Sequence, residues 1–288
     1  MLGKLFKHEW KCTWKVGGMM LLGLVLVSFF GWVSFQAPMW KAIADETRYT
    51  GPSIWDLMSF GTLFMYVIML IGLNYGIIIY MGVRFYRTMY TDEGYLTHTL
   101  PVSKHQILVS KILNSGLWVV LMTVGIYLSV FVLVFSMIGA FIPEGTSWAD
   151  VWSMVEPEIG YMDDMFRDVF GMSMNGYFWM VLLVSLISPF CSMIILFGAI
   201  SMGQLFTKHR VLMAIVCYVG ILIVANIISS TMQSIFSVSQ MARYTSSNVL
   251  AGNYMNVTMW FSAILSIVEA VILYFVSYYV TSRKLNME

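Results

Sequence analysis

The sequence predicts an all-α integral membrane protein with six transmembrane helices, an amphipathic N-terminal interfacial helix and a short cytoplasmic helix between spans two and three. Of the 288 residues, 59% are hydrophobic and only 11% are charged, whereas soluble domains carry about 25% charged residues. Apolar runs of the roughly 20 residues needed to cross a bilayer recur along the chain. Loops and open strands cannot cross lipid unsatisfied, so each run predicts a helix.

The first 15 residues have the pattern of a helix lying in the membrane interface. One helical face collects apolar and aromatic side chains, and the lysines fall elsewhere. The run that follows, near residues 16–35, is longer than a signal-peptide core and lacks a small-x-small cleavage site, so it is expected to be the first span. The face consists of Leu2, Leu5, Phe6, Trp10 and Trp14.

Five more spans are expected along the rest of the chain, which forms one transmembrane domain over residues 1–288 without a separate soluble part. Pro189 removes a backbone donor and should bend the fourth span. The three cysteines are scattered, which indicates neither a disulfide framework nor a metal site. The spans are expected near residues 57–83, 112–142, 176–207, 211–242 and 257–282.

The distribution of lysine and arginine predicts that both termini are cytoplasmic. With that orientation, twelve of the sixteen basic residues lie inside, as the positive-inside rule requires. The four on the outer side are Lys41, Arg48, Arg167 and Arg243. The polar segment 84–111, between spans two and three, is therefore expected to face the cytoplasm.

A two-turn helix is predicted within this segment. Thr91 can cap this helix. Asp92 and Glu93 fall in its first turn, where carboxylates interact favourably with the positive end of the helix dipole. Pro101 biases Leu100 away from helical geometry, so the helix should end near Thr99.

A second helix is expected to begin immediately after this proline. Ser103 and Gln106 have the spacing of a capping box, and Val102 with Ile107 can form a hydrophobic staple around it. This helix continues past Lys111 into the third span. The proline corner therefore joins a short surface helix to a membrane span.

The string DEGYLTHTLPVS, residues 92–103, followed by Lys104, resembles the cytoplasmic loop between spans two and three in permease subunits of the type-2 ABC exporter family. The amphipathic N-terminal helix, the six spans and the cytoplasmic termini are similar too. The resemblance implies that residues 92–99 are the coupling helix, which sits in a cleft of a separate ATPase subunit. It also implies two ATPase chains and a second permease chain, expected to be identical, in each transporter.

The resemblance implies one group of ATPase-coupling residues. Aromatic and apolar side chains on a segment that faces water favour a protein partner. The alternative is that Asp92 and Glu93 form a solvated first turn with no partner. The group comprises Tyr90, Asp92, Glu93, Gly94, Tyr95, Leu96, Leu100 and Pro101.

No phosphate-binding loop of the Gly-x-x-x-x-Gly-Lys-Ser/Thr type occurs in the sequence. The chain itself is therefore expected to be neither an enzyme nor a cofactor protein, and ATP and Mg are expected to be bound by the partner ATPase. Nothing in the net charge of +1 indicates a nucleic-acid partner. The remaining expected partners are membrane lipids.

Glu269 is the one acidic or basic residue deep within a predicted span. A central charge costs roughly 2.5–3.5 kcal/mol to insert, so such residues usually have a function. Glu269 is a candidate substrate contact or gate, together with Asn74 and Asn226. The alternative is a protonated or hydrogen-bonded carboxyl group packed against one of these asparagines or a serine.

The outer segment 143–175 is predicted to contain an amphipathic helix. It carries seven acidic residues, which could favour the release of cationic products if the helix guards the exit. The alternative is a helix that only covers the bundle. The candidate gate residues are Met162, Met165, Phe166 and Phe170.

The expected function is a permease subunit of an ATP-driven exporter in the bacterial cytoplasmic membrane. Hydrophobic or amphipathic peptides, such as toxins, bacteriocins or antibiotics, are the first choice of substrate because the outer domain is small and the core apolar. Alternatives are a permease for lipids or small-molecule drugs, and a proton-coupled secondary transporter that uses Glu269. A membrane-embedded enzyme is disfavoured because no zinc motif or Ser/His/Asp set occurs.

Overall fold

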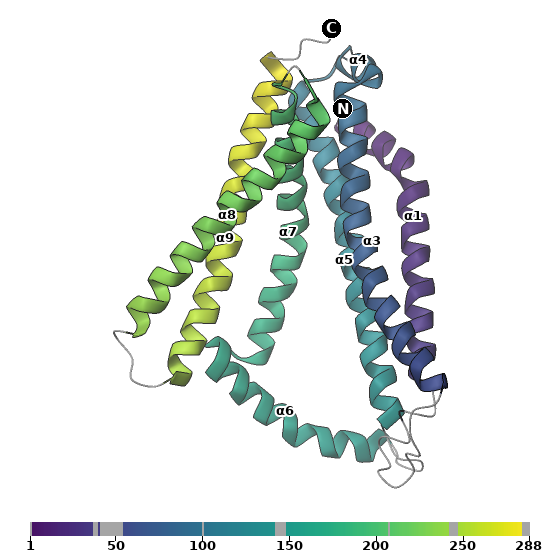
Figure 1. The fold of residues 1–288 in the computed structure, drawn as a ribbon, viewed down its shortest axis with the longest axis vertical. Helices are drawn as coiled ribbons and strands as arrows, with labels where there is room; N and C mark the ends of the chain where they lie inside the picture. The colour runs from purple at the N-terminus through teal and green to yellow at the C-terminus, as the bar shows by residue number, and fades with distance from the viewer. Residues whose placement is uncertain are drawn as a thin grey trace. The chain divides into compact units, whose positions relative to one another are not determined.

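The computed structural model describes residues 2–36, 40, 54–99, 101–141, 148–206, 208–241 and 247–283, and these form helices joined by short turns, without strands. Figure 1 shows their arrangement along the chain. The helices are α1 (Leu2–Ser34), α3 (Ile54–Tyr90), α4 (Asp92–His98), α5 (Lys104–Phe141), α6 (Trp148–Phe170), α7 (Met174–Gly203), α8 (Arg210–Met241) and α9 (Ser247–Arg283).

Six of the described helices, α1, α3, α5, α7, α8 and α9, are long and apolar enough to cross a membrane. Their apolar stretches run from 27 to 36 residues, and 27 residues at about 1.5 Å each exceed the roughly 30 Å of hydrocarbon in a bilayer. The predicted all-helical class with six spans is thereby confirmed. The chain is a multi-pass membrane protein.

The helices α3 and α5 reach further than the predicted spans. Residues 84–90 contain no proline or glycine, so α3 continues to Tyr90. α5 starts at Lys104, immediately after the proline corner. The polar segment 84–111 is thus made of the two helix ends and α4, with only a short turn after His98.

The N-terminal segment and the first predicted span lie in one helix. α1 runs continuously through residues 1–15 of the predicted interfacial segment, from Leu2, and through the span from residue 16. Gly17 and Gly18, the residues at the expected junction, are both helical. The interfacial position of the first 15 residues stays a prediction.

The chain divides into two compact units, which are described separately. The first unit contains residues 1–9, 80–117 and 158–288. Within it α7 packs against α9 and α8, as Figure 1 shows for the green and yellow helices. At the end of α7, a Cβ atom added to Gly203 would lie 2.6 Å from Ala214 of α8. The two helices meet there almost backbone to backbone.

The ends of α3 and α5 join the same unit. Phe85 stacks on Phe197 of α7 with ring centroids 3.9 Å apart. The Tyr90 hydroxyl lies 2.7 Å from the Ser201 hydroxyl, and Lys104 Nζ donates to the backbone oxygen of Thr281 on α9 at 3.0 Å. These contacts gather the ends of four helices around the polar segment.

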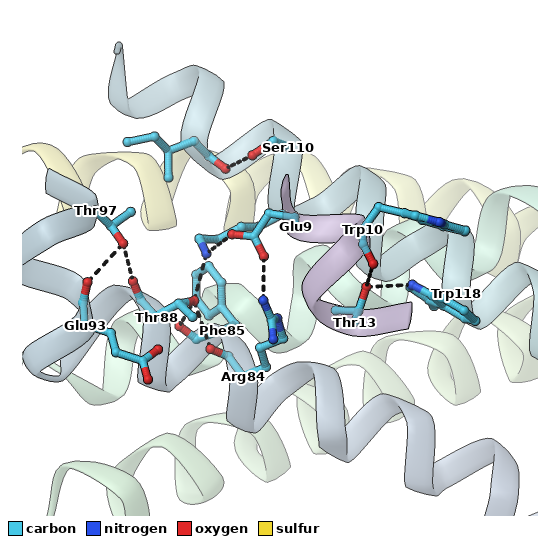
Figure 2. A network of polar contacts seen from close by, with 12 residues as sticks. Glu9, Trp10, Thr13, Arg84, Phe85, Thr88, Glu93, Thr97, Ser110 and Trp118 are labelled. Carbon is cyan, nitrogen blue, oxygen red and sulfur yellow. Dashed lines mark hydrogen bonds and ion pairs between the residues drawn. The ribbon is translucent and has the colours of Figure 1, made fainter. Parts of the chain in front are cut away.

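The second unit contains residues 10–79 and 118–157. Gly17 of α1 lets Trp118 of α5 approach closely, since an added Cβ would lie 2.5 Å from its ring. Trp118 Nε1 donates to Thr13 Oγ1 at 2.8 Å, and Figure 2 shows this bond. Small residues and interhelical hydrogen bonds are the usual means of packing helices in lipid, where the hydrophobic effect supplies no attraction between helices.

Replacing Gly203 by alanine should separate α7 from α8, because the new methyl group would overlap the backbone of Ala214. We expect a loss of about 1–3 kcal/mol of stability, measured by thermal unfolding in detergent. Gly220→Ala on α8 is the matched control, since nothing lies within 4 Å of its added Cβ. Equal melting temperatures for the two variants would contradict the close packing of α7 and α8.

Candidate functional site

The short helix α4 is held at the end of α3 by close contacts, which include an ion pair between Glu93 and Arg87 at 3.9 Å. An added Cβ on Gly94 would lie 2.6 Å from the Met89 carbonyl oxygen, so no larger side chain fits between the two backbones. Thr97 Oγ1 donates to the backbone oxygen of Thr88 at 3.1 Å. Figure 2 shows this bond beside Glu93. α4 is therefore held at a defined place on α3.

The cap predicted at the start of α4 is wrong. The Thr91 side chain makes no capping bond to α4 and instead donates to the Arg87 carbonyl oxygen at 2.6 Å. Threonine hydroxyls compete for the carbonyl groups of the preceding turn in this way. The cap predicted for α5 is present in part, since Ser103 Oγ accepts from the Gln106 N–H at 3.3 Å.

The predicted ATPase-coupling residues divide into an inward and an outward set. Tyr90 points inward to Ser201, and Gly94 is buried against Met89. Glu93, Tyr95 and Pro101 are exposed, with Tyr95 exposed to 62%. Asp92 and Leu96 lie in α4, but their side chains are outside the described part of the structure, and Leu100 is outside it altogether.

A buried charge cluster lies next to α4 in the first unit. It consists of Glu9 of α1, Arg84 and Thr88 of α3, and Lys111 of α5. Glu9 Oε1 is 2.6 Å from Lys111 Nζ, and Glu9 Oε2 is 3.2 Å from an Arg84 guanidinium nitrogen. Lys111 Nζ also donates to Thr88 Oγ1 at 2.7 Å. Figure 2 shows the Glu9 carboxylate directed at these partners.

The pocket at this charge cluster is too small for a substrate. Its space amounts to about 10 Å³, which is close to the minimum for one water molecule. The rest of its lining consists of Met81, Phe85, Asn114, Ser115 and Phe197. The side chains of the cluster are therefore packed against one another.

Glu9 is a site residue that the sequence analysis missed. It is the only acidic residue before Asp45, and helical spacing puts it on the same face as Leu2, Leu5 and Phe6. An acidic residue on the apolar face of a lysine-rich helix was the available signal. For its partners Arg84 and Lys111, the sequence indicates only a position on the cytoplasmic side.

Among the described residues, no hydrogen bond joins Glu269 to Asn226, its candidate partner in the same unit. Glu269 is half-buried on α9. Asn226 is exposed on α8 and donates to the Leu222 carbonyl oxygen of its own helix at 2.8 Å, which does not favour the alternative in which it packs against the Glu269 carboxyl group. Asn74 is half-buried on α3, in the other unit. A role for these three residues stays a prediction.

The predicted helix in the outer segment is present as α6. Met162 and Met165 are exposed, while Phe166 and Phe170 pack on Tyr177 of α7 with centroids 5.3 and 4.4 Å apart.

A hydrogen bond braces the corner between α6 and α7. Asp163, which pairs with Arg167 of its own helix at 2.8 Å, accepts the Met174 N–H at 2.8 Å. The corner carries the end of α6, so any gate movement of Met162 and Met165 would have to include α7.

Comparison of the chain with family models, curated proteins and solved structures gives no match. Among the described residues, no group of three or more His, Cys, Asp or Glu side chains is placed to hold a metal ion. The arrangement that stands out is α4 with its exposed tyrosine, next to a buried cluster of charges.

Gly94→Ala should displace α4 from α3, because the added methyl group meets the Met89 backbone rather than a flexible side chain. Alanine favours helices by about 1 kcal/mol over glycine, but an overlap of this kind costs about 1–3 kcal/mol. We expect faster amide hydrogen exchange across residues 92–99. Gly72→Ala on α3, where the added Cβ has no neighbour within 4 Å, is the control; unchanged exchange in Gly94→Ala would contradict the docking of α4.

Proposed function

We propose that this chain is the membrane permease subunit of an ATP-driven exporter of the type-2 ABC family. α4 would be the coupling helix that receives the motion of a separate ATPase subunit. ATP and Mg would bind only to that partner. Two copies of this chain and two ATPase chains would form the transporter, in the bacterial cytoplasmic membrane with both termini inside.

One observation carries the proposal, namely the way in which α4 is presented. Its inner side is fastened to α3 through Gly94 and Thr97. Its outer side carries the exposed residues Glu93 and Tyr95. Exposed aromatic side chains on a rigid support are typical anchors of protein interfaces, since they bind with little loss of conformational freedom.

The attachment of α4 supports a direct route for force. α4 is joined to α3 by one residue and leads into α5 through the turn at Pro101. A displacement of α4 by the partner would therefore act on two membrane-spanning helices at once. The sequence predicts that the proline corner connects α4 to α5. The contact of Gly94 with Met89 adds an attachment of α4 to α3.

Hydrophobic or amphipathic peptides remain the proposed substrates. The six apolar helices and the amphipathic helix α6 at the proposed exit fit such molecules. Lipids and small-molecule drugs are the alternative cargo of the same machinery.

Affinity purification of the chain from its native membrane, followed by an ATPase assay, tests this proposal. We expect an ATPase to co-purify with the wild type and to be lost with Glu93→Lys/Tyr95→Ala, because both exposed α4 side chains change. Truncating a tyrosine that is a hot spot of an interface costs about 2 kcal/mol or more, which is roughly thirtyfold in affinity.

Two controls match the double variant. Lys208→Glu reverses a charge at another exposed position of the predicted cytoplasmic side, and Tyr161→Ala removes a tyrosine exposed to 70% on α6. Both should retain the ATPase. Absence of any ATPase from the wild-type sample would contradict the proposal and favour proton-driven transport, with Glu269→Gln as the next variant to assay.

A further inference from the structure

The charge cluster joins three helices at the base of α4. Arg84 lies near the end of α3, Lys111 near the start of α5, and α4 connects these two helices. Both cations bind the same carboxylate, which comes from a distant part of the chain, at the start of α1. Glu9 therefore lies between the two helices that lead into and out of the polar segment.

The two cations need this carboxylate. The Lys111 side chain is only 5% exposed and the Arg84 side chain 21%, so water screens their mutual repulsion poorly. Removing one partner from a buried ion pair is strongly unfavourable. Without Glu9, the repulsion between Arg84 and Lys111 would be offset less, which favours separation of the ends of α3 and α5.

The hydrogen bonds continue from the cluster into α4. Lys111 donates to the Thr88 hydroxyl at 2.7 Å, and the Thr88 backbone oxygen accepts the bond from Thr97 of α4 at 3.1 Å. A change in the distance between α3 and α5 would thus act on the residue that holds α4.

We propose that Glu9 is a positioning residue that clamps α3 to α5, and so presents α4 in a single orientation. Its carboxylate occupies a site made by two cations, and that site is too small to take up a transported substrate. The clamp is a property of this chain alone. Its use in coupling rests on the proposed function, because it requires a partner that binds α4.

The clamp is tested by measuring the distance between spin labels at positions 83 and 117. Val83 on α3 and Leu117 on α5 are both exposed. The native cysteines Cys12, Cys191 and Cys217 are first replaced by alanine. We expect a narrow distance distribution with Glu9 present, and a broader, longer one in Glu9→Gln, which keeps the shape of the side chain but removes its charge.

Chemical rescue separates loss of charge from loss of packing. In Glu9→Ala, added acetate should enter the vacated site and narrow the distribution again, whereas the neutral acetamide should not. Sodium chloride at the same ionic strength controls for screening. Lys7→Gln, which removes one exposed charge from the same helix, should leave the distribution unchanged.

A second-site variant keeps the test decisive if Glu9→Gln folds poorly. Glu9→Gln/Lys111→Met leaves only one cation of the pair, so Arg84 and Lys111 no longer repel each other and the distribution should be narrower than in Glu9→Gln. The proposal is overturned if Glu9→Gln has the wild-type distribution, or if the double variant is as broad as Glu9→Gln.

The role of the clamp in coupling is tested by measuring the affinity of each variant for the purified ATPase partner. If α4 occupies its binding orientation only about a tenth of the time in Glu9→Gln, the apparent affinity for the partner falls about tenfold. Acetate should restore that affinity in Glu9→Ala. If no ATPase binds the wild type, the proposed function fails, and the label distances still decide the clamp. If the ATPase binds and Glu9→Gln leaves the distances unchanged, the clamp fails alone.

Discussion

The absence of water from the hydrocarbon of a bilayer is the constraint on which this structure depends. Every backbone N–H and carbonyl group there must be satisfied within the chain, so the spanning elements are helices. In the first unit, polar contacts gather at the ends of α3, α5, α7 and α9. The bonds from Tyr90 to Ser201 and from Lys104 to Thr281 are examples.

The polar segment is held by interactions of two kinds. Close backbone contact at Gly94 fixes α4 to α3, and the ion pairs of Glu9 connect α3 to α5. The contact at Gly94 requires a residue without a side chain, and the ion pairs require that the Glu9 carboxylate neutralises the cations around it. Together they leave Glu93 and Tyr95 exposed on a rigid element, which is the arrangement that an interface with a soluble partner requires.

The sequence was sufficient for the parts of the structure that depend on local patterns. The six apolar helices, the two-turn helix after Thr91 and the cap by Ser103 follow from composition and residue spacing. Glu9 could not be paired with Arg84 and Lys111 in the same way, because 75 and 102 residues separate them along the chain. The capping bond predicted for Thr91 is absent because its hydroxyl can bond either to an N–H of α4 or to a carbonyl oxygen of α3. Residue spacing alone does not show which of these bonds is preferred.

A photoreactive amino acid placed at position 95 tests the central claim most directly. Irradiation of native membranes should join the exposed α4 residue to a nucleotide-hydrolysing subunit, and the same probe at position 161 on α6 should not form that product. Tyr95 and Tyr161 are both tyrosines and are similarly exposed, at 62% and 70%, so the chemistry of the two sites is matched. No adduct at position 95, or the same adduct at both positions, would contradict a coupling role for α4.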